Sequence, residues 1–155
     1  MNVVVDRVRK SYGRGDAAKE VLTETSLTVH AREFVSIVGP SGCGKSTLLM
    51  MMAGLLRPSS GEIRLGDEPV TGPPAGLSVV FQDYSRSLFP WMSVRRNLTT
   101  ALNAARLSKS EQRSRVEHAL ASVGLDGKGE MYPWEMSGGM QQRVAIARAW
   151  SPSRP

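Results

Sequence analysis

The sequence has 155 residues, of which 41% are hydrophobic and 22% charged, a balance typical of a folded globular chain rather than a disordered one. Its 20 lysines and arginines exceed its 14 acidic residues, and the formal charge of +6 permits phosphate, nucleic-acid or anionic-membrane partners without choosing among them. A single cysteine excludes an internal disulfide framework, and two histidines argue against a histidine-based metal centre. We expect no secretory signal and no membrane span, because no apolar stretch approaches the roughly 20 residues that cross a bilayer.

The first part of the chain has the pattern of an α/β fold. Short runs rich in β-prone and apolar residues predict strands, and a run of helical composition lies among them. A strand, a helix and further strands within one segment predict an α/β core. The predicted strands are residues 3–8, 22–29, 34–38, 62–65 and 77–81, and the predicted helix is residues 45–56.

The second part of the chain has helical spacing of its apolar residues. Ser93 is a predicted N-cap, and Ser108 with Glu111 has the spacing of a capping box. Gly124 predicts the end of a helix, and residues 137–150 predict the last one. The predicted domains are an α/β domain at residues 1–92 and a helical domain at residues 93–150, followed by a tail at residues 151–155.

The strongest motif matches G-x-x-x-x-G-K-[ST] between a predicted strand and a predicted helix, which is the context this motif requires. Its glycines let successive backbone N–H groups surround phosphates, and the start of the helix adds a favourable dipole. Lys45 would supply a charge for the β- and γ-phosphates, and the Ser46 hydroxyl would bind Mg²⁺. The predicted phosphate loop consists of Gly39, Pro40, Ser41, Gly42, Cys43, Gly44, Lys45, Ser46 and Thr47.

Further candidates lie outside the phosphate loop. Ser137, Gly138 and Gly139 precede the last predicted helix and form a second candidate anion site. An aromatic ring such as Tyr12 can stack on a purine, and a glutamine at a strand end, such as Gln82, can coordinate Mg²⁺ or orient a water. Alone, Tyr12 is more often an ordinary half-buried tyrosine, and Gln82 is as easily a polar residue at a strand end. Two anion sites imply either two bound anions or nucleotides shared between two copies.

Tyr12, the phosphate loop, Gln82 and the sequence MSGGMQQRVAIARA occur in the order and spacing of ATP-binding cassette (ABC) ATPases, and the chain resembles that family. The resemblance implies a P-loop NTPase (RecA-like) core with an N-terminal antiparallel β subdomain and a helical subdomain that carries the signature. It also implies that Tyr12 stacks on adenine, that Gln82 contacts Mg²⁺ and that Lys45 and Gln82 serve catalysis. A second copy would close over ATP through its Ser137, Gly138, Gly139, Met140 and Gln141.

Three shorter sequences are similar to those of importers of nitrate, alkanesulfonates and taurine. They are GGMQQR, Phe-Pro-Trp at residues 89–91 and Tyr-Pro at residues 132–133. The resemblance implies a head-to-tail homodimer with ATP and Mg²⁺, at the cytoplasmic face of the membrane. Its partners would be transmembrane permease subunits and, indirectly, a solute-binding protein, with no nucleic acid expected. Trp91 lies where the family receives a helix of the transmembrane subunit, and ordinary burial of its ring is an equal alternative.

Three residues depart from the usual pattern of the family or carry a reactive group. Arg32 stands where the family usually has a turn glycine, and Met140 replaces the usual glutamine of the signature. Cys43 lies in the phosphate loop, where a helix N-terminus and Lys45 would favour its thiolate. Because phosphate binding needs only the backbone at this position, we interpret Cys43 as a small loop residue.

The resemblance also implies an Asp and a Glu at the end of an apolar strand and a later histidine, and these are missing. No apolar run ending in Asp-Glu occurs in the 155 residues, and the expected strand would begin at Pro155. We therefore expect an incomplete cassette that is unstable alone and hydrolyses ATP slowly or not at all. The alternatives are a non-catalytic nucleotide-binding regulatory fragment and a soluble ABC protein that acts on nucleic acid. A P-loop kinase would leave Ser-Gly-Gly unexplained.

Overall fold

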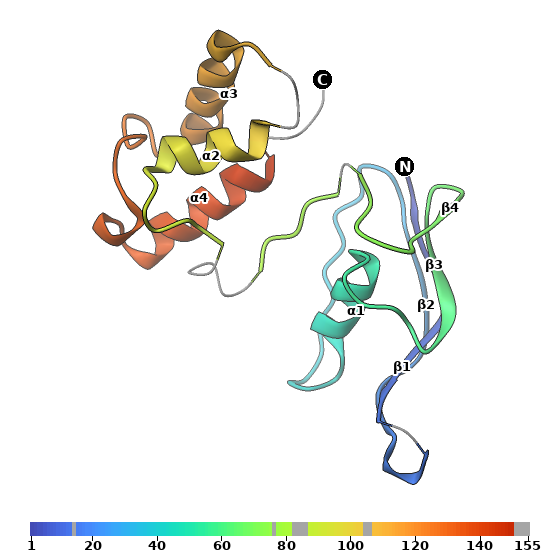
Figure 1. The fold of residues 1–155 in the computed structure, drawn as a ribbon. Coiled ribbons are helices and arrows are strands. Elements are labelled where there is room, and N and C mark those ends of the chain that lie inside the picture. The colour runs from blue at the N-terminus through green and yellow to red at the C-terminus, as the bar shows by residue number, and fades with distance from the viewer. Residues whose placement is uncertain (14, 76, 82–86, 104–106, 151–155) are drawn as a thin grey trace. The chain divides into compact units, whose positions relative to one another are not determined.

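The computed structural model describes residues 1–13, 15–75, 77–81, 87–103 and 107–150. Two compact units divide the chain between Leu77 and Ser78 (Figure 1). Unit 1 is built on a β-sheet and unit 2 on α-helices. Unit 2 includes Leu88, which is buried in its helical core.

Unit 1 contains a four-stranded antiparallel sheet with the strand order β2-β1-β3-β4. The long central strand β1 (Val3–Tyr12) pairs with β2 (Lys19–Val29) on one side and with β3 (Ser60–Leu65) on the other. The 3-10 turn η1 (Gly15–Ala17) connects β1 to β2, and the short β4 (Glu68–Pro69) completes the sheet beside β3. The predicted antiparallel β subdomain is therefore confirmed.

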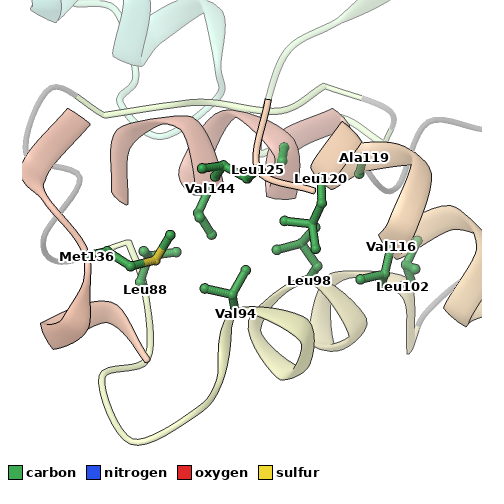
Figure 2. Packing of buried hydrophobic residues seen from close by; sticks show 11 residues of the cluster. Leu88, Val94, Leu98, Leu102, Val116, Ala119, Leu120, Leu125, Met136 and Val144 are labelled. Carbon is green, nitrogen blue, oxygen red and sulfur yellow. The ribbon is translucent and has the colours of Figure 1, made fainter. Parts of the chain in front are cut away.

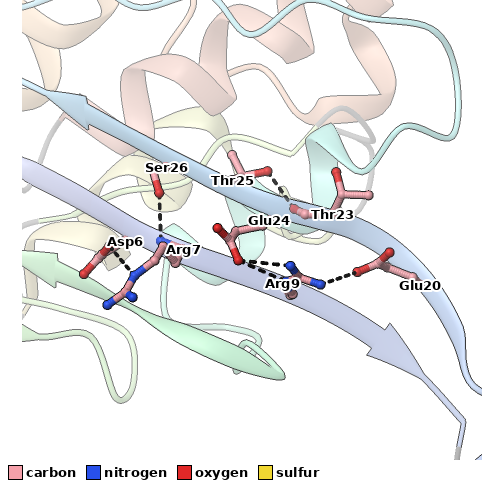
Figure 3. Close-up of polar contacts among 8 residues, drawn as sticks. All are labelled: Asp6, Arg7, Arg9, Glu20, Thr23, Glu24, Thr25 and Ser26. Carbon is pink, nitrogen blue, oxygen red and sulfur yellow. Dashed lines mark hydrogen bonds and ion pairs between the residues drawn. The ribbon is translucent and has the colours of Figure 1, made fainter.

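A β-bulge in β1 brings two core valines to the same face of the sheet. Val5 and Val8 are three residues apart and would face opposite sides of a regular strand. The pairing with β2 shifts register between them, and Arg7 has a positive φ of 45°. The extra residue of the bulge turns Val8 back to the core. The Arg7 N–H then donates to Ser26 Oγ at 2.9 Å, as Figure 3 shows.

The core of unit 1 lies between this sheet and the helix α1 (Lys45–Met52). The sheet and the helix contribute apolar side chains that are almost fully buried, and burial of each such side chain stabilises the fold by about 1.5–3 kcal/mol. Arg9, by contrast, forms solvent-exposed ion pairs with Glu20 and Glu24 of β2 (Figure 3), and such pairs add little stability. The buried cluster consists of Val5, Val8, Leu22, Leu48, Met51 and Ile63.

The strands predicted at residues 34–38 and 77–81 are not formed. Both segments are irregular and pair with no other segment among the described residues. Most of their apolar side chains are open to solvent, with Phe34 95% and Val38 84% exposed and Val79, Val80 and Phe81 also exposed, whereas Ile37 packs against the core of unit 1. A strand needs a neighbour for its backbone N–H and C=O groups, so an apolar run alone does not make one.

The helix predicted at residues 45–56 ends earlier than expected. The N–H groups of Gly54 and Leu55 donate to Met51 O and Met50 O, and Gly54 adopts a positive φ of 69°. A Cβ at Gly54 would also lie 2.1 Å from the carbonyl oxygen of Gly72. The glycine therefore terminates α1 instead of continuing it. Arg32 also has a positive φ, 65°, which agrees with its place at a turn that favours glycine.

Unit 2 packs three described α-helices, with caps at the predicted residues. They are α2 (Val94–Leu102), α3 (Lys109–Ser122) and α4 (Gly138–Trp150). The Ser93 side chain accepts the Arg96 N–H, and Ser108 and Glu111 form the predicted capping box. The hydrogen bonds from Ser108 lower the pKa of the Glu111 carboxyl. Gly124, with φ of 66°, follows the end of α3 as predicted.

The apolar faces of these helices meet in one core. Figure 2 shows side chains of α2, α3 and α4 pointing toward one another, with Leu88 and Met136 at one end. Arg95 of α2 adds a polar bridge because it donates to Glu117 and Glu130 at 2.5 Å each, and these hydrogen bonds raise its pKa. The buried cluster consists of Leu88, Val94, Leu98, Leu102, Val116, Ala119, Leu120, Leu125, Met136, Val144 and Ala147.

Candidate functional site

The phosphate loop leads directly into α1 and has the conformation that its glycines allow. Gly42 and Gly44 have positive φ values of 83° and 94°. A Cβ at Gly44 would lie 2.8 Å from Val21 O, and a Cβ at Gly39 would lie 2.9 Å from Cys43 Sγ. Side chains at these positions would fill the loop or strain its backbone. The loop is therefore a backbone-lined cradle suited to phosphate.

Lys45 lies over this cradle. Its Nζ donates to Gly39 O at 2.8 Å and to Pro40 O at 2.7 Å, and it lies 3.7 Å from Cys43 Sγ. The carbonyls thus hold the ammonium group at the loop, where it can meet an anion. Gly44 is the N-cap of α1 and supplies no side-chain hydrogen bond, so no side chain competes for the first N–H groups of the helix. Positive charge and free donors converge on one surface.

Few of the described side chains near the phosphate loop can act as ligands for a metal ion. Ser46 lies in the first turn of α1 and is exposed, so its hydroxyl is free to be a ligand. Gln82, the other predicted ligand, lies outside the described residues. The part of the chain that the structure describes has no group of three histidine, cysteine or acidic side chains that would hold a metal by itself. Ser46 therefore offers one hydroxyl oxygen that suits Mg²⁺.

Tyr12 is partly exposed at the end of β1. It is the last residue of β1 in unit 1, the unit that also contains the phosphate loop. Its side chain is 47% exposed, and Lys10 Nζ lies 5.1 Å from the ring centroid. The ring is therefore partly accessible for stacking, with the Lys10 ammonium group over one face.

The signature segment, residues 136–143, lies in unit 2 at the start of α4. Ser137 Oγ accepts the Met140 N–H at 3.4 Å, as in a helix N-cap, and a Cβ at Gly139 would meet no atom within 4 Å. The Gln141 side chain faces back and donates to Pro133 O at 2.8 Å and to Met136 O at 3.1 Å. Ser137 and Gly139 are thus exposed, whereas the Gln141 amide holds the preceding turn.

Sequence reasoning missed two polar residues of unit 2. Asn97 is completely buried in α2 and hydrogen bonds the loop before that helix, and Arg148 of α4 contacts the same loop. The signal for Asn97 was a polar residue within the apolar face of a predicted helix. Arg148 carried no such signal, because an arginine near the C-terminal end of a helix is ordinary. Trp91 of this loop is 67% exposed, so the alternative of core burial is wrong.

These features define a P-loop nucleotide-binding protein: a glycine cradle, an overlying lysine and an open helix N-terminus. The family model described as ABC transporter matches residues 22–155. The chain belongs to the ABC transporter family. Among the described residues, no helix is both long and apolar enough to cross a membrane.

Relatives and solved structures agree with this family. The chain is 46% identical over 151 residues to the Fe(3+) ions import ATP-binding protein FbpC of Agrobacterium fabrum, covering 96% of this chain and 41% of that protein. It is 45% identical over 148 residues to the nitrate import ATP-binding protein NrtD of Synechococcus elongatus, covering 94% and 53%. The chain thus spans about half the length of the curated relatives it matches. The dimeric structure of MJ0796, a bacterial ABC transporter cassette, aligns with a TM-score of 0.86 and 31% identity, covering 97% of this chain and 69% of that one.

Proposed function

We propose that the chain binds ATP at the phosphate loop and forms part of the ATP-binding subunit of an ABC importer. The observation that carries this proposal is the loop conformation, with Lys45 held over the glycine cradle. Backbone N–H groups of the loop would bind the phosphates, and Lys45 would exchange two carbonyl partners for phosphate oxygens. Tyr12 would stack on the base.

Mg²⁺ accompanies the nucleotide in this proposal. Ser46 would hold the ion, with Gln82 as a second ligand, and the ion would neutralise charge on the phosphates. Phosphoryl transfer also needs a carboxylate near the ion and a group that orients water. No apolar run ending in Asp-Glu occurs among the 155 residues, so we propose that these residues alone bind ATP with little or no turnover.

A second copy would complete the site. Ser137 and Gly139 are exposed at the start of α4, with Gly138 between them, which suits contact with a nucleotide bound to the other subunit. Met140 would lie beside them, and Gln141 would support the turn through its bonds to two carbonyls. The solved cassettes that this chain resembles are dimeric, which supports a head-to-tail homodimer.

The membrane partners would be permease subunits at the cytoplasmic face, with a solute-binding protein as an indirect partner. The exposed ring of Trp91 would contact the permease. Nitrate, sulfonate or taurine import is supported by GGMQQR and the Phe-Pro-Trp run, and by the similarity to a nitrate import protein. A relative named for Fe(3+) import is equally similar, so uptake assays must separate these solutes.

Titration of the purified chain with ATP by calorimetry tests the proposal. Lys45→Ala is expected to weaken binding at least about tenfold, because a lost charge-assisted hydrogen bond is worth about 1.5–3 kcal/mol and each 1.4 kcal/mol is tenfold. Lys109→Ala, at the exposed start of α3, is the matched control and should bind as the parent does. Equal affinity of the Lys45 variant would refute the site. Mg²⁺-dependent phosphate release that disappears in that variant would show that the 155 residues do hydrolyse ATP.

A further inference from the structure

The loop that precedes α2 presents an aromatic pair to solvent. Trp91 is the exposed member, and Phe89 is half-buried beneath it in contact with the rest of unit 2. The two ring centroids are 5.6 Å apart, with an interplanar angle of 44°. This separation lies within the range of favourable aromatic contacts, so the position of Phe89 affects that of Trp91.

The backbone of this loop is fixed by Asn97. The Asn97 Oδ1 accepts the Phe89 N–H at 2.8 Å, and its Nδ2 donates to Phe89 O and Met92 O at 3.1 Å each. A buried amide with these partners holds both ends of the turn around Trp91. Asn97 does not contact the aromatic rings through these bonds, so the side-chain orientation needs another support.

Arg148 supplies that support from α4. Its guanidinium carbon lies 5.0 Å from the centroid of the Phe89 ring, within the range of a cation–π contact. Its Nη1 also donates to the carbonyl oxygen of Ser87. One planar group therefore holds both the ring and the backbone of the loop, which a lysine ammonium would do less well.

We propose that Arg148 is a positioning residue that fixes the Trp91 surface to α4, the helix whose first turn carries the signature. The helix is continuous from Gly138 to Trp150, and Val144 and Ala147 are buried in the core. The signature and the support of Trp91 thus belong to one rigid element. This inference rests on the proposed function, in which Trp91 contacts a permease. A ring fixed in advance loses less conformational freedom when a partner binds.

The order parameter of the Trp91 indole N–H, measured by ¹⁵N relaxation, tests this inference in the chain itself. Arg148→Met is expected to lower it from about 0.85, typical of rigid groups, to below about 0.6, typical of flexible ones. Arg148→Lys keeps the charge without the planar group and should give an intermediate value. Arg143→Met is the matched control, because Arg143 also lies in α4 and donates to a backbone carbonyl, that of Val123, at 3.0 Å.

A purely structural role for Arg148 would lower stability without loosening Trp91 selectively. An unchanged order parameter in Arg148→Met, or an equal fall in Arg143→Met, would overturn the inference. If Arg148→Met does not fold, Phe89→Leu removes the ring on which the guanidinium acts, and the same loss of order is expected. No loss of order in that variant would also refute the positioning role.

The proposed contact with a permease is tested separately. Trp91→Ala in the full-length cassette should reduce its recovery with membranes that contain the permease, and it removes no bond of Arg148 to Ser87. Unchanged recovery together with a loosened indole in Arg148→Met would leave the positioning role intact and refute the permease contact. Reduced recovery together with an unchanged indole would give the opposite conclusion.

Discussion

Asn97→Ala is expected to destabilise unit 2 by about 2–4 kcal/mol. The side chain is fully buried, and its removal leaves the Phe89 N–H and Met92 O without another hydrogen bond among the described residues. An orphaned buried polar group costs about 1–3 kcal/mol, and two groups in a partly buried loop give the stated range. Phe89 O keeps its hydrogen bond from the Met92 N–H at 3.1 Å, so it adds little to the loss of stability.

Urea unfolding followed by tryptophan fluorescence measures this change. All three tryptophans, Trp91, Trp134 and Trp150, lie in unit 2, so the signal reports that unit alone. Thr99→Val is the matched control on the same helix, because the Thr99 hydroxyl donates at 2.8 Å to Arg95 O, a carbonyl of that helix, and not to the loop. We expect less than about 0.5 kcal/mol for this control. A loss below about 1 kcal/mol in Asn97→Ala would refute the reasoning that these loop groups depend on the amide.

Three further predictions follow from local geometry. Ser108→Ala should destabilise α3 by about 1 kcal/mol through loss of its N-cap. Ser108 lowers the pKa of Glu111 from its ordinary 4.5, so the difference in stability between parent and variant should be full above that pH and shrink as the pH falls through the lower pKa of the folded state. Urea titrations at several pH values measure this difference. Gly54→Ala should cost more than about 1 kcal/mol, because a Cβ there would lie 2.1 Å from Gly72 O, and calorimetric melting measures it. Phe34→Ser should leave stability within about 0.5 kcal/mol, since the ring is 95% exposed, while reducing self-association in sedimentation experiments.

Local signals were sufficient for much of this fold. The capping box at Ser108 and Glu111, the N-cap at Ser93 and the stop at Gly124 depend on contacts within a few residues, and the structure confirms each of them. The phosphate loop could be predicted from the sequence for the same reason. The positive φ values of Gly42 and Gly44 are properties that only glycine adopts without cost.

Features that depend on distant partners could not be read this way. Residues 34–38 have the composition of a buried strand, yet a strand forms only where another segment supplies hydrogen bonds. The bulge at Arg7 depends on its pairing with β2, and no residue type announces it. The roles of Asn97 and Arg148 depend on a loop that meets two helices, which is a tertiary arrangement. The hydrogen bonds of the Gln141 side chain to Pro133 O and Met136 O likewise depend on the fold of the preceding turn.

Cys43 makes the phosphate loop open to selective labelling by a thiol reagent. It is the only cysteine of the sequence and is exposed, and its sulfur lies within 3.7 Å of Lys45 Nζ. A thiol reagent would therefore modify one atom of the chain, at the place where phosphates would enter. The rate of that modification reports whether the loop is occupied, and it does so without any turnover. Occupancy of the loop thereby becomes measurable independently of ATP hydrolysis.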